Sequence, residues 1–250
     1  MYCPPEHHAF ARRADYNRDC LARIYLGRRS SSTKSANFTL RNFNLHIDQL
    51  RALGLPVQHY AVAIAKALAT IHWAANVSAY DIEFVLGGRR KTEHGKAGVN
   101  LKLLKDAAQS TTPATLCELE AELAIAALGQ MEPTSSNDAQ GMQLWVLDFN
   151  LCGMWEEQVG WENPEALLGC LVESFFENDP YYPLPLAKHE EDRELWSAFR
   201  EAYAARARTI LHEKDARLHE LPEKFLDACE ERERERLAAG KGHGSRDQKQ

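Results

Sequence analysis

The sequence contains few of the features by which a function is usually recognised. Its six cysteines are scattered over 250 residues and form no C-x-x-C pair. A structural zinc site therefore has little support, and we expect no zinc. The phosphate-binding GxxxxGK[ST] motif, the metalloprotease HExxH motif, the hydrolase GxSxG motif and the EF-hand loop are also missing. These absences exclude the enzyme classes that depend on such motifs.

Long apolar runs and an excess of basic charge are missing too. No apolar run approaches the roughly 20 residues of a membrane-spanning helix, and the first residues lack the regions of a signal peptide. The chain has 30 Lys and Arg against 36 Asp and Glu, a formal charge of −6, which disfavours nucleic acid as a partner. We expect an intracellular protein, cytoplasmic or nuclear, with no membrane partner; its partner is unknown, and a protein is one candidate.

The residues that are present favour a globular fold. Apolar residues make up 44% of the chain and charged residues 26%, a balance that excludes general disorder. Alternation of apolar residues predicts a strand over 20–27 and a second over 37–43. A basic, Ser-rich turn separates them, and we interpret the pair as a β-hairpin with a long loop.

Helical spacing of apolar residues begins after this pair. It predicts a helix over 47–53 and a more strongly apolar, Ala-rich helix over 56–73, which we expect to be central and buried. A strand is predicted over 81–86, stopped by Gly87 and Gly88.

The next segment, about 88–141, has the character of an insertion. Its first part is basic and polar, residues 113–128 are predicted to form an amphipathic helix, and residues 131–141 resemble a loop. A strand over 142–150 follows and ends in Asp148-Phe149-Asn150. A carboxylate at a strand end is held rigidly and remains exposed, so sites are often found there.

The last part of the chain is predicted to be helical. Helices are expected over 164–176, 190–211 and 221–237. A Pro-rich ordered turn lies at 178–185, in which an Asx-type turn is the simplest interpretation of Asn178 and Asp179. Residues 240–250 are expected to form a disordered tail.

This order of elements resembles the larger lobe of protein-kinase-like phosphotransferases. The sequence therefore predicts an α+β fold, mainly α-helical: a kinase-like C-terminal lobe with a β-hairpin and an inserted helical segment, as a single domain over 1–239. The resemblance implies that Asp148, in Asp148-Phe149-Asn150, takes the place of the Mg2+-binding Asp, and Asp81 that of the metal-binding Asn. Both would then hold Mg2+ and ATP.

The kinase pattern fails at several positions. The resemblance implies a catalytic Asp five residues before Asp81, and that position holds Asn76, which cannot act as a base. The glycine-rich loop and the strand lysine are absent. His72 precedes the expected histidine position, and we interpret it as part of a packed helix terminus. Asp81 and Glu83 are expected to share one face of a strand.

Several segments together resemble an uncharacterised fungal family, catalogued as a domain of unknown function and often labelled zinc-finger protein. Its members usually have more chain before the first strand pair, so we expect this sequence to be shortened at its N-terminus. The resemblance extends from about residue 17 to 211. The segments that carry it are 17–27, 38–48, 72–73, 81–87, 147–152 and 178–183.

Two functions from different classes stay open. The first is an atypical or degenerate phosphotransferase that uses Mg2+ and ATP, with Asp148 and Asp81 as ligands and Asn76 in the base position. The alternative is a non-catalytic, pseudokinase-like interaction or scaffold protein, in which Asp148 only caps a turn after a strand.

Overall fold

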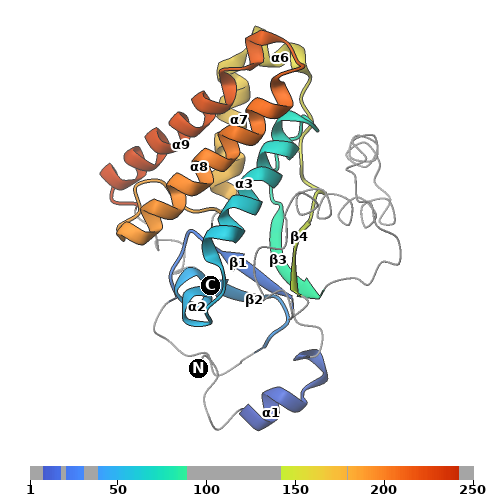
Figure 1. Cartoon of the computed structure of the whole chain (residues 1–250), viewed down its shortest axis with the longest axis vertical. Coiled ribbons are helices and arrows are strands. Elements are labelled where there is room, and N and C mark those ends of the chain that lie inside the picture. The colour runs from blue at the N-terminus through green and yellow to red at the C-terminus, as the bar shows by residue number, and fades with distance from the viewer. Residues whose placement is uncertain (1–7, 18–20, 31–38, 89–141, 179, 242–250) are drawn as a thin grey trace.

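The computed structural model describes residues 8–17, 21–30, 39–88, 142–178 and 180–241 (Figure 1). The elements in chain order are α1 (His8–Arg13), the 3-10 turn η2 (Asp15–Asn17), β1 (Ala22–Tyr25), β2 (Phe43–His46), α2 (Ile47–Ala52), α3 (Val57–Trp73), β3 (Glu83–Gly88), β4 (Met142–Leu147), α6 (Glu157–Glu162), α7 (Pro164–Glu177), α8 (Glu190–Leu211), the 3-10 turn η4 (Ala216–Leu218) and α9 (Leu221–Ala238).

Helix α3 lies at the centre of the helical layer. Its alanines are small enough for neighbouring helices to approach closely, and 13 of its 17 residues are buried. It packs most extensively on α8, which lies beside it in Figure 1, and α9 covers α7 and α8. The predicted central helix is confirmed, as are the helices predicted over 47–53, 164–176, 190–211 and 221–237.

Aromatic side chains fill the space between these helices. Phe175 of α7 stacks on Tyr182 at a centroid distance of 4.5 Å, and Phe199 of α8 stacks on Trp196 at 5.6 Å. Phe225 of α9 joins them at 6.0 Å from Phe175. Aromatic pairs of this kind add to the stabilisation from apolar burial, so this cluster joins the C-terminal helices into one core.

The four-stranded sheet has the order β2-β1-β3-β4 and is mixed. Strands β1 and β2 are parallel, with Ile24 opposite Leu45, so the predicted β-hairpin is wrong. Parallel neighbours need a crossover connection, and the 17 residues at 26–42 are long enough to provide one. The second strand lies at Phe43–His46 rather than over 37–43, of which 37–38 fall outside the described residues.

Strands β3 and β4 form an antiparallel pair, with Glu83 opposite Leu147. The two glycines predicted to stop β3 belong to it instead. A side chain at Gly87 would meet the ring of Trp145 at 3.2 Å, so glycine leaves room for the neighbouring strand's indole.

The predictions for the insertion lie outside the described residues, and so do those for residues 242–250. The described part is an α+β fold, mainly helical, with α3 and α6–α9 above the small sheet and α1 below it in Figure 1. Among the described helices, none combines the length and the apolar character that crossing a membrane requires.

Candidate functional site

Two loops meet at one end of the sheet. The α3–β3 loop (residues 74–82) and the β4–α6 loop (residues 148–156) are joined by reciprocal bonds. The Ser78 backbone N–H donates to the Gly153 carbonyl at 2.8 Å, and the Gly153 N–H donates to Ser78 Oγ at 3.0 Å. The pairing fixes one loop against the other.

Both loops contain residues in the left-handed backbone region. Asn76, Ala79 and Asp81 have φ values of 59°, 58° and 62°, and Asp148 has 68°. They are four of the six non-glycine residues with positive φ in the described part of the chain. The conformation costs about 1–2 kcal/mol for most residues, so it is strained at Ala79, whereas Asn and Asp adopt it more readily. Strained backbone gathers at functional sites.

The left-handed turn at Asp148 decides which side chain enters the core. Leu144 and Val146 alternate along β4 and are buried, so a continued strand would direct Asp148 inward as well. Instead the chain turns at Asp148, which is half-buried, and Phe149 is buried in the core at 6% exposure. The turn thus keeps a carboxylate at the surface beside an apolar anchor.

The structure brings Asp148 and Asp81 together. Burial raises the pKa of Asp148, the negative charge of Asp81 raises it further, and Arg23 of β1 opposes the change. Burial likewise raises the pKa of Glu83, which forms an ion pair with Arg23 at 2.5 Å and also interacts with Asp148. The site therefore holds three carboxyl groups that interact with one another, and two of them, Asp148 and Glu83, also interact with the Arg23 guanidinium.

The expected arrangement of Asp81 and Glu83 on one strand face is wrong. Strand β3 begins at Glu83, and Asp81 lies in the turn before it with its side chain exposed. The left-handed turn breaks the two-residue alternation on which the expectation rested.

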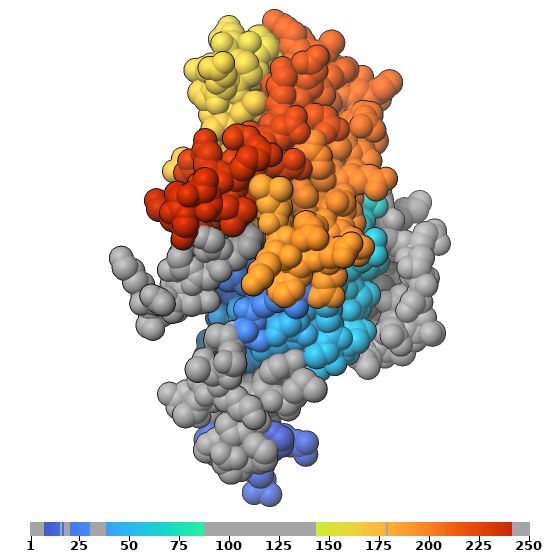
Figure 2. All heavy atoms as spheres, turned by 90° about the vertical axis from the view of Figure 1, so that its left-hand side faces the viewer, coloured from blue at the N-terminus to red at the C-terminus, as the bar shows by residue number. Residues whose placement is uncertain are grey.

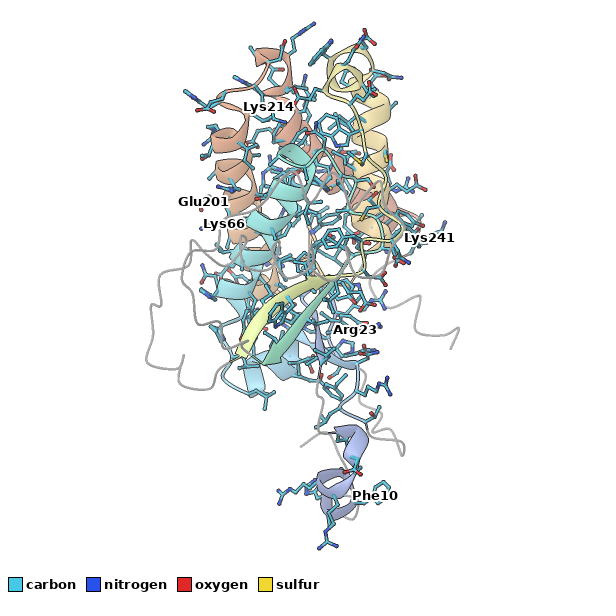
Figure 3. All side chains as sticks on the ribbon, turned by 90° about the vertical axis from the view of Figure 1, so that its right-hand side faces the viewer. Phe10, Arg23, Lys66, Glu201, Lys214 and Lys241 are labelled. Atoms are coloured by element: carbon cyan, nitrogen blue, oxygen red, sulfur yellow. The ribbon has the colours of Figure 1, made fainter. Side chains whose placement is uncertain are left out.

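Asn76 is directed toward a different group. Its side chain is buried, and Oδ1 accepts a hydrogen bond from Lys214 Nζ at 3.2 Å, while Lys214 forms an ion pair with Glu157 at 2.5 Å. Figure 3 shows Lys214 among the helices, well separated from Arg23 at the sheet. The Asn76 side chain therefore contacts the connection between α8 and η4.

His72 and Trp73 form a packed helix terminus, as predicted. Trp73 Nε1 donates to the Tyr203 hydroxyl at 2.8 Å, and that hydroxyl lies 2.7 Å from His72 Nδ1. Burial lowers the pKa of His72 to about 3, although a backbone group of Ser78 partly opposes this. The imidazole is therefore neutral at physiological pH and has a structural role.

Asn178 is the residue of the site that the sequence did not reveal. Its side chain is buried, and Oδ1 accepts from the Asp81 backbone N–H at 2.6 Å. Its Nδ2 donates to the Ala79 carbonyl at 2.5 Å and to the Tyr182 hydroxyl at 3.0 Å. The Asn178 side chain thus makes a contact across 97 residues of chain, which no local pattern could indicate. The other residue of the predicted Asx-type turn, Asp179, lies outside the described residues.

The carboxylates of Asp81 and Asp148 fit Mg2+ better than a metal ion that is held by protein side chains alone. Within residues 8–17, 21–30, 39–88, 142–178 and 180–241, no group of three or more His, Cys, Asp or Glu is arranged to hold a metal ion. Mg2+ is commonly held by one or two carboxylates together with water and the phosphates of a substrate. Asp81 and Asp148 supply two carboxylates of that kind.

The comparison with known families then found one similarity. Residues 144–215 match the model of a domain of unknown function described as zinc finger protein. The match supports the resemblance to an uncharacterised family, and it includes Asp148 and Asn178 but not Asp81. The comparisons with curated proteins and with solved structures found no match.

Proposed function

We propose that this protein is an intracellular, degenerate kinase-like protein that binds Mg2+ and ATP through Asp81 and Asp148. The order of elements supports the proposal: a buried helix, a loop, an antiparallel strand pair, an acidic strand end, and further helices. The proposal includes membership of the fungal family that the sequence resembles.

One observation carries the proposal. Asp81 and Asp148 each adopt a left-handed backbone, and they are close enough for the charge of Asp81 to raise the pKa of Asp148. A fold gains no stability from holding like charges near each other at a partly buried position. A divalent cation bound between Asp81 and Asp148 would remove the repulsion between their carboxylates.

Binding is better supported than phosphoryl transfer. The amide of Asn76 cannot accept a proton from a substrate alcohol, and its oxygen is already bonded to Lys214. In the proposed site, Asp81 and Asp148 would supply oxygen ligands, and Mg2+ would neutralise charge on the phosphates. Arg23 adds a positive charge nearby.

The test compares isosteric amide variants. We expect Mg2+ with ATP to raise the melting temperature of the unaltered chain, and the rise to disappear in Asp148→Asn and in Asp81→Asn. Asp227→Asn is the matched control, because it removes the same charge from an exposed residue of α9 that pairs with Arg200. An unaltered chain that shows no shift with Mg2+ and ATP would contradict the proposal.

The alternative is a non-catalytic interaction or scaffold protein without nucleotide. The engagement of Asn76 by Lys214 also favours a fold that has lost its chemistry. A binding measurement with Mg2+ and ATP separates the two proposals. Phosphorylation of a small alcohol by the purified chain would exclude a non-catalytic scaffold protein, provided that Asp148→Asn abolishes this activity.

A further inference from the structure

We propose that Asn178 is a positioning residue that holds the Asp81 carboxylate in place for cation binding. This inference rests on the proposed function for its ligand, Mg2+ with nucleotide phosphates. Its structural basis is the set of contacts between the end of α7 and the α3–β3 loop. Asn178 follows the last residue of α7, far in sequence from the loop that it contacts.

The two bonds from Asn178 to the loop bracket its most strained part. Oδ1 accepts from the Asp81 N–H, and Nδ2 donates to the Ala79 carbonyl. Ala79 and Asp81 are both left-handed. Alanine has no side-chain group that compensates for this conformation, so an external bond has to stabilise it. A carboxamide can do so because it offers an acceptor and a donor at once.

Asn178 is itself held rigidly. The carboxamide is 3% exposed, and its remaining donor capacity is used by the Tyr182 hydroxyl. Tyr182 is fixed in turn by stacking on Phe175 of α7 and by an edge contact with Phe84 of β3, at centroid distances of 4.5 and 5.9 Å. The path from Asp81 to the aromatic core thus consists of short contacts, and those of Asn178 with Ala79 and Tyr182 are buried.

This rigidity has a consequence for the site. Asp81 is exposed, so side-chain packing does not fix its carboxylate. Its position depends on the backbone of the turn, and that backbone is bonded to Asn178. Groups that orient a metal ligand without touching the ion commonly change affinity by about 10–100-fold when removed. We expect an effect of that size here.

The test uses Mn2+ with ATP, because the paramagnetism of Mn2+ allows free and bound ion to be distinguished. Asn178→Ser removes both bonds to the loop, and we expect it to weaken Mn2+ binding by about tenfold or more. Tyr182→Phe is the matched control. It removes the third bond of Asn178 and leaves the two bonds to the loop, so we expect affinity within about twofold of the unaltered chain.

A second measurement makes the result independent of the ligand. Amide hydrogen exchange should show the Asp81 N–H protected in the unaltered chain and in Tyr182→Phe. It should exchange about tenfold faster or more in Asn178→Ser, with the amides of α8 unchanged. Asn178→Thr also lacks the carboxamide that makes both bonds, so it provides a second variant if the serine variant does not fold.

The outcomes separate the two proposals. Equal Mn2+ affinity in Asn178→Ser and the unaltered chain would overturn the positioning role and leave the proposed function standing. An Asp81 amide without protection in the unaltered chain would overturn it as well. An unaltered chain that binds no Mn2+ with ATP would overturn the proposed function, while faster exchange at Asp81 in Asn178→Ser would still support the structural contact.

Discussion

The helical layer and the paired loops at the end of the sheet differ in their energetics. Helices α3, α7, α8 and α9 bury regular apolar faces against each other, and each contributes to one aromatic core. The α3–β3 and β4–α6 loops keep carboxylates near each other and hold four residues in left-handed conformations. The helical layer stabilises the fold. The loops lower the stability, because their carboxylates repel each other and part of their backbone is strained.

The space-filling view shows the helical layer from one side. In Figure 2 the helices α8 and α9 form a continuous surface, with the N-terminal strands and α2 below them. The two regions are connected by buried groups, among them His72 at the end of α3 and Asn178 at the end of α7. Substitutions can therefore weaken one region while the other is monitored.

The largest expected effect is in the helical layer. Phe199→Ala removes a fully buried ring that contacts Trp196, Tyr203 and Tyr182, and it should lower the free energy of unfolding by about 3–5 kcal/mol. Urea denaturation followed by circular dichroism measures the loss. A loss below about 1 kcal/mol would contradict the view that this aromatic core holds the helices together.

The next largest effect is expected at His72, which connects the helical layer to the loops, and it depends on pH. The pKa of His72 is lowered to about 3, whereas the unfolded chain has an ordinary histidine pKa near 6.5. Between these values the unfolded state binds the additional proton, so stability should fall by about 1.4 kcal/mol per pH unit as the pH decreases.

His72→Asn tests this slope, because its side chain can still bond to the Tyr203 hydroxyl. Urea denaturation at several pH values below 6.5 should show that the variant lacks the proton-linked loss. The exposed His189, at the start of α8, provides the control as His189→Asn. An unchanged slope in His72→Asn would show that other groups cause the acid sensitivity.

The smallest effect is expected in the loops. Since the pKa of Asp148 is raised, the folded chain binds its proton more readily than the unfolded chain. Stability is therefore lost as the pH rises through the ordinary carboxyl pKa toward the raised one. Asp148→Asn avoids this loss, so its melting temperature relative to the unaltered chain should be higher at pH 7 than near pH 4, by about 1–3 °C.

Scanning calorimetry at the two pH values, without added metal, measures this difference. Asp227→Asn is the control, because its carboxylate lies on α9 and belongs to the helical region. The same pH dependence in both variants would mean that the repulsion is not specific to the loops. The opposite sign for Asp148→Asn would show that Asp148 is stabilised when ionised.

The sequence predicted most of the helices because their signals are local. The apolar spacing in α3, α7, α8 and α9 recurs every three or four residues, and Pro164 marks the start of α7. The direction of the first strand pair could not be predicted in this way. Alternation identifies a strand but not its neighbour, and β1 and β2 are parallel where a hairpin was expected.

Asp148 stood out in the sequence because it follows an apolar strand, and Asp81 because of its place in the kinase-like order of elements. The β3–β4 pairing then brought them together. Which groups surround them was decided only by the tertiary structure. Asn76 is directed to Lys214, and Asn178 reaches Asp81 from 97 residues away. Secondary structure follows from neighbouring residues, whereas a buried polar contact depends on where distant segments meet, because burial obliges each polar group to find a partner there.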